Sequence, residues 1–409
     1  MNMPCSTSAQ TRSLTPRRLN LLVFTTLYPN AEQPHHGIFV ENRLRHLIQA
    51  SGYDARVLAP VPWFPFTNRS FGDYAAFARV PLRERRHGID VAHPRYPVIP
   101  KLGMAASPWL LYRAARPAAR RLLAAGYSFD AIDAHYVYPD GVAAALLARD
   151  LGLPFVVTGR GTDLNLIPRY PLARRMIQWT VRRASGLVTV CDALRDDFDA
   201  IGVPRERVKV LRNGVDLAVF DRDDAGAHRL KVQLGVKRPV VASVGHLIPR
   251  KGHDLVIRAF AGLDEGTLLI AGTGPEAGRL RRLSADLGVA DRVHFLGAID
   301  HTALKQVYSA ADVLVLASSR EGWPNVLLES LACGTPVVAT AVYGSPEVVQ
   351  DPRAGRIVAA RTPAALTRAI RDVVAQDIDP GAVRRYAEKF SWDATSRGQM
   401  ALFTAIANR

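Results

Sequence analysis

The stretch EGWPNVLLESLACGTPVVAT, which begins at Glu321, holds the residues best suited to bind and react with a substrate. Pro324 fits the first position of a helix, where its missing N–H removes no hydrogen bond. The N–H groups of Asn325 and Val326 would then point outward at the positive end of the helix dipole, a suitable place for a diphosphate. Glu321 and Glu329 flank this anion site, so we expect them to bind sugar and ribose hydroxyl groups, which donate hydrogen bonds to carboxylates.

A second stretch, SVGHLIPRKGHDLVIRAF, supplies positive charge. Its pattern predicts a strand, a loop and a helix, with Arg250 and Lys251 adjacent in the loop and Gly245 and His246 before them. Two neighbouring cations are suited to neutralise a diphosphate at a nearby helix. A histidine with an ordinary pKa of about 6.5 is mostly neutral at pH 7 and adds little fixed charge.

Together these stretches resemble the family-4 retaining glycosyltransferases, also called group 1 glycosyltransferases. The family signature is two glutamates separated by seven residues, followed by small residues and a strand of the Pro-Val-Val-Ala type. The resemblance implies that Glu321 contacts the transferred sugar and Glu329 the ribose. We expect the segment between them to bind the donor diphosphate through Gly322, Trp323, Pro324, Asn325 and Val326. The alternative interpretation is an exposed pair of glutamates beside a core strand.

The family commonly has an arginine where this chain has His246, and a lysine at Lys251. We therefore hypothesise that Arg250 takes over the role of that arginine. A glycine turn, AGTGPE, follows a later strand, and in the family it lies near the nucleotide, which makes Gly274 a candidate for donor binding. Taken alone, the segment is equally consistent with an ordinary turn.

The first half of the chain contains the residues expected to face the acceptor. Gly37 opens a helix after the first strand and would let the backbone approach a ligand closely. The resemblance implies that this ligand is the donor phosphate. The family commonly has His-Gly-x-Asp in a later loop, where this chain has Arg160, Gly161, Thr162 and Asp163. An arginine cannot act as a general base at pH 7, although it can bind phosphate or orient hydroxyls.

Three further features complete the expected acceptor side. Arg160 and Asp163 could instead form a structural ion pair near the loop. His135 ends a strand and either borders the cleft or is a buried structural histidine. Asn213 begins the segment NGVD, which matches a further family pattern at the end of the first domain.

Two series of short apolar runs, each alternating with helix-like segments, would position these residues. They predict an α/β fold of two facing Rossmann-like domains, the GT-B architecture that the resemblance also implies. The expected parts are a flexible tail at 1–16, an acceptor-side domain at 17–215, a linker at 216–238, a donor domain at 239–390, and a helix at 391–409 that crosses back onto the first domain. The expected strands are Leu19–Phe24, Ala55–Ala59, Phe129–Ala134, Phe155–Thr158, Leu187–Val190, Val240–Val244, Thr267–Ala271, Arg292–Leu296, Val313–Ala317 and Pro336–Ala339.

The net charge of +16 is concentrated in the first half of the 409-residue chain. Residues 1–215 contain 29 lysines and arginines against 16 aspartates and glutamates, and the remainder 24 against 21. Such a field attracts nucleic acid, anionic lipid or a phosphorylated substrate. We expect no nucleic-acid partner, because no recognised binding signature accompanies the charge. Two basic stretches with aromatic residues, 102–126 and 169–183, indicate either attachment to an anionic membrane surface or ordinary amphipathic helices.

Three widely spaced cysteines and no apolar run of membrane-spanning length predict a cytoplasmic protein, either free or held at the inner face of the plasma membrane. The resemblance implies a UDP- or GDP-linked sugar as donor, and a glycan, a lipid-linked molecule or a small molecule as acceptor. It also implies retention at the anomeric carbon without a cofactor or metal ion. A role in cell-envelope or extracellular polysaccharide assembly is our interpretation. The alternatives are a nucleotide-sugar epimerase or hydrolase of the same fold and, from another class, a basic nucleic-acid-binding protein.

Overall fold

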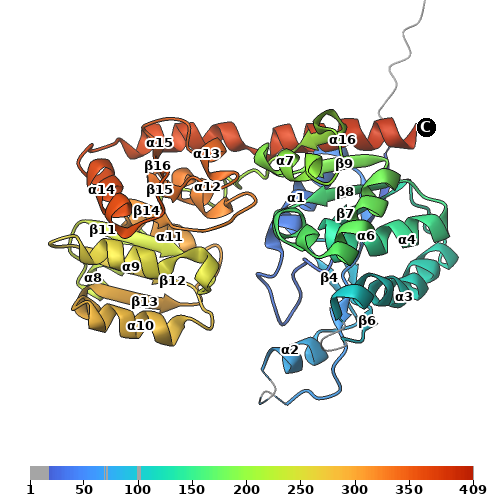
Figure 1. The fold of residues 1–409 in the computed structure, drawn as a ribbon, viewed down its shortest axis with the longest axis horizontal. Helices are drawn as coiled ribbons and strands as arrows, with labels where there is room; N and C mark the ends of the chain where they lie inside the picture. The colour runs from blue at the N-terminus through green and yellow to red at the C-terminus, as the bar shows by residue number, and fades with distance from the viewer. Residues whose placement is uncertain (1–17, 69, 71, 99–102, 409) are drawn as a thin grey trace, which may run out of the picture.

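Two α/β domains lie side by side in the structure, a computed structural model that describes residues 18–68, 70, 72–98 and 103–408 (Figure 1). The N-terminal domain is blue to green in Figure 1, and the C-terminal domain is yellow to red. The predicted tail, residues 1–16, lies outside the described residues. Each domain is built on a mainly parallel sheet, which confirms the predicted class of two Rossmann-like domains.

The N-terminal sheet has eight strands, and every neighbouring pair is parallel except the edge pair β5 (Ile89–Ala92) and β4 (Arg83–Arg86). These two strands and the short strand β10 (Val208–Val210) were missed in the sequence, because they lack a long apolar run. A separate pair, β3 (Val61–Pro62) and β6 (Arg95–Tyr96), lies beyond this sheet. In spatial order the eight strands are β10 (Val208–Val210), β9 (Gly186–Thr189), β8 (Phe155–Gly159), β7 (Ala131–His135), β1 (Asn20–Phe24), β2 (Asp54–Leu58), β5 (Ile89–Ala92) and β4 (Arg83–Arg86).

The C-terminal sheet has six parallel strands, and five of them are the strands expected from the sequence. The sixth, at the edge, was not predicted. In spatial order the strands are β13 (Val293–Gly297), β12 (Thr267–Ala271), β11 (Val240–Val244), β14 (Val313–Leu316), β15 (Val337–Thr340) and β16 (Gly355–Val358).

Helices cover both faces of each sheet, as parallel sheets with apolar residues on both faces require. The N-terminal helices are α1 (Ile38–Ser51), α2 (Asp73–Arg79), α3 (Gly103–Ala124), α4 (Val142–Leu151), α5 (Thr162–Asn165), α6 (Pro171–Arg183) and α7 (Ala193–Asp199). The others are α8 (Asp224–Leu234), α9 (His253–Ala261), α10 (Ala277–Asp286), α11 (Leu304–Ala310), α12 (Asn325–Ala332), α13 (Ser345–Val348), α14 (Pro363–Val374), α15 (Pro380–Ala387) and α16 (Trp392–Ala407).

The segment expected to be a linker, 216–238, contains the helix α8. The side chain of Asp223 caps this helix by accepting a hydrogen bond from the backbone N–H of Gly226, and α8 packs against α11 of the C-terminal domain. The segment showed no strand pattern because it is helical, and most of it therefore belongs to the C-terminal domain.

The last helix, α16, runs along the N-terminal domain at the top of Figure 1 and packs against α1. Leu402, Phe403 and Ile406 are buried there in a cluster with the strands β1 and β2. The chain thus returns to its first domain, and the two domains are held together both by the linker and by α16. Among the described helices, none combines the length and apolar composition that a bilayer-spanning segment needs.

Candidate active site

A cleft of about 290 Å³ is lined by residues of both domains. These residues follow the carboxyl ends of strands, where open α/β sheets bind their ligands. They come from the segments after β1, β7, β8, β9, β10, β11 and β14, including the first turns of α1, α5 and α12. The lining residues are Leu27, Phe39, Tyr136, Arg160, Gly161, Thr162, Val190, Asn213, Arg250, Lys251, Arg320, Glu321, Gly322, Trp323, Pro324, Asn325 and Val326.

The helix α12 begins at Asn325, one residue later than the sequence predicted. Pro324 has a ψ of 84° and is therefore the residue before the helix rather than its first residue. The expectation that the N–H of Asn325 is free is wrong, because it donates to the carbonyl of Trp323 at 3.1 Å. The N–H of Val326 has no acceptor among the described residues. Of the two N–H groups expected to be free, only that of Val326 is free, and Val326 lines the cleft.

Glu321 is held by three hydrogen-bonding or charged neighbours. Its Oε1 accepts hydrogen bonds from Lys251 Nζ at 2.7 Å and Ser318 Oγ at 2.6 Å. Its Oε2 lies 3.5 Å from Arg250 Nη1. Burial by itself would raise the pKa of Glu321, but Lys251, Ser318 and Arg250 together lower it below the ordinary value. Glu321 is therefore an ionised hydrogen-bond acceptor at neutral pH.

Glu329 is buried in the second turn of α12 and is also engaged at both oxygens. Tyr308 donates its hydroxyl to Oε2 at 2.7 Å, and His301 Nε2 lies 3.1 Å from Oε1. Burial alone lowers the pKa of His301, but the Glu329 carboxylate outweighs this and raises it. A carboxylate has about four lone-pair positions. Glu329 lines a small pocket beside Asn325 and is not among the described lining residues of the cleft.

The positive charge of the cleft comes from four side chains: Arg160, Arg250, Lys251 and Arg320. Arg250 is half-buried and lines the cleft, whereas His246 is exposed and is not among the lining residues. Arg250 therefore adds fixed positive charge to the cleft, and its replacement of the family's arginine stays a prediction.

Close backbone contacts account for Gly37 and Gly274, and a φ of +147° accounts for Gly245. Gly37 has a φ of +69°, and a Cβ there would lie 2.3 Å from the carbonyl oxygen of Leu27. A Cβ on Gly274 would lie 2.4 Å from the carbonyl oxygen of Leu247, and Gly245 lies against the side chain of Lys251. None of the three glycines is among the described lining residues. The structure therefore gives them a role in shaping the loops.

The two domains meet at the cleft through backbone that only glycine permits. A Cβ on Gly322 would lie 1.8 Å from the carbonyl oxygen of Arg160, and a Cβ on Gly161 would lie 3.3 Å from the Cα of Gly322. Beside this contact, Asn213 Nδ2 donates to Asn325 Oδ1 at 3.2 Å. The loop that contains Arg160 and Gly161 is thus in direct contact with the loop that contains Gly322. The two loops were predicted from separate halves of the sequence.

Asp163 binds backbone N–H groups rather than the guanidinium of Arg160. Its carboxylate accepts hydrogen bonds from the N–H of Val137 at 2.7 Å, Arg160 at 3.1 Å and Gly161 at 2.8 Å. The alternative of an ion pair between Arg160 and Asp163 is not seen among the described contacts. Asp163 therefore shapes the loop that brings Arg160 and Gly161 to the cleft.

A buried network of charged and polar side chains supports Arg160. Arg160 Nη2 donates to His135 Nδ1 at 2.8 Å, and His135 Nε2 lies 3.3 Å from Asp133 Oδ2. Burial lowers the pKa of His135 to about 4, so the ring is neutral and donates from Nε2. His135 does not line the cleft, which favours the structural alternative for this residue. It links Arg160 to Asp133.

Several site residues were not found in the sequence. Ser318 and Arg320 directly precede Glu321, and their only signal was their position in the loop after a predicted strand. His301 and Tyr308 lie 28 and 21 residues before Glu329, and no spacing rule connects them to it. Such contacts depend on tertiary packing. Among the described residues, no cluster of three or more His, Cys, Asp or Glu side chains could hold a metal ion.

Two facing parallel α/β domains with this cleft at their strand ends define a two-domain protein of the GT-B class. Residues 225–390 match the family model for glycosyl transferases group 1, and residues 40–214 match a glycosyl transferase 4-like domain. The D-inositol 3-phosphate glycosyltransferase of Acidothermus cellulolyticus is 33% identical over 310 residues, which cover 69% of this chain and 68% of that protein. The chain belongs to the group 1 glycosyltransferases, and the predicted family is confirmed.

Other relatives carry the same name, but their match with this chain covers fewer residues. The proteins of Geodermatophilus obscurus and Mycobacterium tuberculosis are 37% and 35% identical, and the match spans about half of their lengths, 54% and 52%. Among solved structures, sucrose-phosphate synthase from Thermosynechococcus elongatus has a TM-score of 0.77 at 21% identity, covering 95% of this chain and 98% of that one. Anabaena HepE in complex with UDP and glucose has a TM-score of 0.73 at 21% identity, covering 95% and 100%. These likenesses show the fold.

The contact between Gly322 and Arg160 makes a testable prediction about stability. In Gly322→Ala, the new methyl group must displace the carbonyl of Arg160, so we expect the free energy of unfolding to fall by about 1–3 kcal/mol. Urea unfolding measures this. Gly278→Ala is the matched control, because a Cβ at Gly278 meets only the tip of Arg282, 3.7 Å away. Equal stability of the two variants would contradict the close contact.

The neutral, buried His135 predicts a pH dependence. Its folded pKa of about 4 lies below the ordinary value, so the unfolded chain takes up a proton between about pH 6.5 and 4 that the folded chain does not. This contribution to stability is complete at pH 7 and is lost as the pH falls through that range. When the pH is lowered from 7 to 5, the free energy of unfolding should fall by about 2 kcal/mol more in the wild type than in His135→Gln.

Urea unfolding at pH 7 and pH 5 checks this difference. His228→Gln is the control, because His228 is exposed on α8. It should keep the pH dependence of the wild type. If His135→Gln also kept that dependence, His135 would not be the buried neutral group described above.

Proposed function

We propose that this glycosyltransferase takes its sugar from a nucleoside diphosphate sugar and transfers it with retention at the anomeric carbon. The observation that carries the proposal is the charge of the cleft: four cations and one carboxylate surround the start of α12. A diphosphate there meets Lys251, Arg250 and the free N–H of Val326. The solved Anabaena HepE complexes contain UDP or UDP-glucose, and a starch synthase of the same fold contains ADP, which supports this class of donor.

The proposed mechanism depends on stabilising the leaving group. Preorganised cations and backbone N–H groups are worth most where negative charge develops, and the departing diphosphate is such a place. Glu321, held by Lys251 and Ser318, orients the hydroxyls of the transferred sugar, and Glu329 binds the ribose. We propose that the leaving phosphate takes the proton of the acceptor hydroxyl, because Arg160 cannot accept one and Glu321 is held by two cations. Neither a metal ion nor a protein nucleophile has a part in this scheme.

The acceptor is proposed to be a glycan, a lipid-linked molecule or a small molecule, within cell-envelope or extracellular polysaccharide assembly. The relatives named for D-inositol 3-phosphate have a phosphorylated substrate in their name. The excess of positive charge in the N-terminal half of this chain suits an acceptor that carries phosphate or another acidic group.

Donor binding and turnover can be separated experimentally. A panel of UDP- and GDP-linked sugars is screened for an increase in the unfolding temperature, since a ligand that binds the folded protein stabilises it. With the donor found, Glu321→Gln should lower turnover at least about 100-fold, because it weakens contacts to the reacting sugar. The nucleoside diphosphate alone should still bind this variant. Unchanged turnover in Glu321→Gln would overturn the proposed site.

Two further variants test where the fixed charge lies. Arg250→Ala should weaken donor binding and slow turnover, whereas His246→Ala is the control and should leave both near the wild-type values. The opposite result would assign the charge to His246. The epimerase or hydrolase alternative would be favoured by two results together. The protein would release nucleoside diphosphate rapidly from the donor alone, and no extract tested would supply an acceptor.

We also propose that the N-terminal domain attaches to the inner face of an anionic membrane through the start of α3. Of the aromatic residues in the two basic stretches, Trp109 is 51% exposed and stacks with Arg113, while Tyr112 and Trp179 pack partly against the core. Vesicles with anionic lipid should therefore sediment the wild type more than Trp109→Ser. Val232→Ser, at an exposed site on α8, should behave as the wild type does. Equally negligible binding to anionic and neutral vesicles would contradict attachment.

A further inference from the structure

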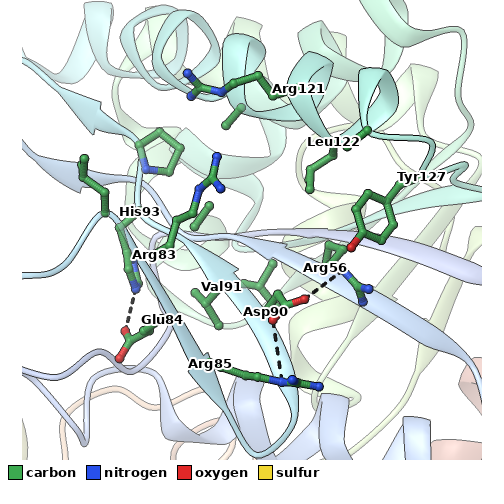
Figure 2. A pocket seen from close by; sticks show the side chains of 16 residues that line it. Arg56, Arg83, Glu84, Arg85, Asp90, Val91, His93, Arg121, Leu122 and Tyr127 are labelled. Carbon is green, nitrogen blue, oxygen red and sulfur yellow. Dashed lines mark hydrogen bonds and ion pairs between the residues drawn. The ribbon is translucent and has the colours of Figure 1, made fainter.

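A second cavity, of about 930 Å³, lies in the N-terminal domain between the second half of α3 and the sheet edge formed by β2, β5 and β4 (Figure 2). It shares none of its lining residues with the described lining of the cleft. Its size is within the range of about 300–1,000 Å³ that is usual for small-molecule sites. The lining residues are Arg56, Val57, Leu82, Arg83, Glu84, Arg85, Asp90, Val91, Ala92, His93, Pro94, Ala118, Arg121, Leu122, Ala125 and Tyr127.

The carboxylates of this cavity are already paired with cations. Asp90 lies between two arginines, 3.4 Å from Arg56 Nε and 3.8 Å from Arg85 Nε. Glu84 Oε1 lies 2.7 Å from His93 Nε2. Figure 2 shows these pairs as dashed lines, with Arg56 and Arg85 both directed at Asp90. Neither acidic group is therefore available to the remaining cations.

Two arginines of the cavity, Arg83 on β4 and Arg121 on α3, have no carboxylate partner among the described residues. Figure 2 shows their side chains extending into the cavity from its two sides, one from the sheet and one from the helix. Two guanidinium groups that converge from opposite walls suit a phosphate, which accepts paired hydrogen bonds from the planar fork of each arginine. The charge of the cavity is thus complementary to an anion.

Most of the remaining lining is apolar. Val57 and Val91 are buried beneath the cavity, Leu122 and Ala118 face it from α3, and Leu82 is 66% exposed at its edge. An inorganic ion would leave this apolar surface in contact with water, which costs free energy in proportion to its area. A ligand that carries both a phosphate and an apolar body would cover it. An acidic peptide fits less well, because it offers polar backbone to an apolar wall.

We propose that this cavity binds a single lipid phosphate, with its phosphate between Arg83 and Arg121 and its apolar chain along α3. The site is separate from the cleft, so the proposal does not depend on the donor or on glycosyl transfer. It also differs from attachment to a bilayer surface, because the ligand is one molecule taken up in a cavity. Binding alone therefore tests it.

Isothermal titration calorimetry with dihexanoyl phosphatidic acid, kept below the concentration at which it forms micelles, measures this binding on the full chain. We expect the dissociation constant to rise at least tenfold in the double variant Arg83→Ser and Arg121→Ser. The matched control is Arg45→Ser with Arg149→Ser, which removes the same charge from exposed positions on α1 and α4. That control should bind as the wild type does. Circular dichroism of all variants checks that they are folded.

Two further ligands decide which part of the molecule is recognised. Dihexanoylphosphatidylcholine, which is zwitterionic, should bind at least tenfold more weakly than the phosphatidic acid. Inorganic phosphate should also bind at least tenfold more weakly. Equal binding of inorganic phosphate would reduce the site to an anion site, and equal binding of the choline lipid would remove the role of the arginines. Either result, or equal loss in the control variant, would overturn the proposal.

Discussion

The contact between Lys251 and Glu321 is the interaction on which the arrangement of the cleft depends. It joins the loop after β11 to the loop after β14, and so fixes both loops at the start of α12. Arg250 strengthens the connection, because its side chain contacts both Glu321 and the carbonyl of Arg320. A buried carboxylate without these cations would be neutral or strongly destabilising, so the positive residues and the glutamate require each other. The same cations remain beside the helix start, where a diphosphate would lie.

The N-terminal domain meets this cluster through backbone rather than through charge. Gly161 and Gly322 allow two loops to touch, and Asp163 holds the shape of one of them through three N–H groups. Arg160 lines the cleft, and its guanidinium group donates a hydrogen bond to the neutral, buried ring of His135. Because α16 packs against α1, this helix connects the two domains in addition to the linker. The cleft is therefore formed by contacts that either domain alone would lack.

The sequence predicted most of the fold because long apolar runs mark the buried parallel strands, as in Val240–Val244 and Thr267–Ala271. It missed the edge strand Arg83–Arg86, whose four residues are all charged and form no apolar run, and it treated the helix α8 as a linker. Motif spacing found Glu321 and Glu329, but their partners Ser318, His301 and Tyr308 come together only through packing. The N–H of Asn325 is bound because Pro324 is the centre of a tight three-residue turn, and composition carries no signal of that.

The central claim is that a donor diphosphate binds at the start of α12, between the cations of the loop after β11 and the N–H of Val326. The most direct measurement is a crystal structure of the chain with the nucleotide sugar that stabilises it. The account predicts diphosphate oxygens within about 3 Å of Lys251 Nζ and the N–H of Val326, with Glu321 bonded to sugar hydroxyls. A nucleotide bound outside this cleft, or a diphosphate that contacts neither Lys251 nor α12, would contradict it.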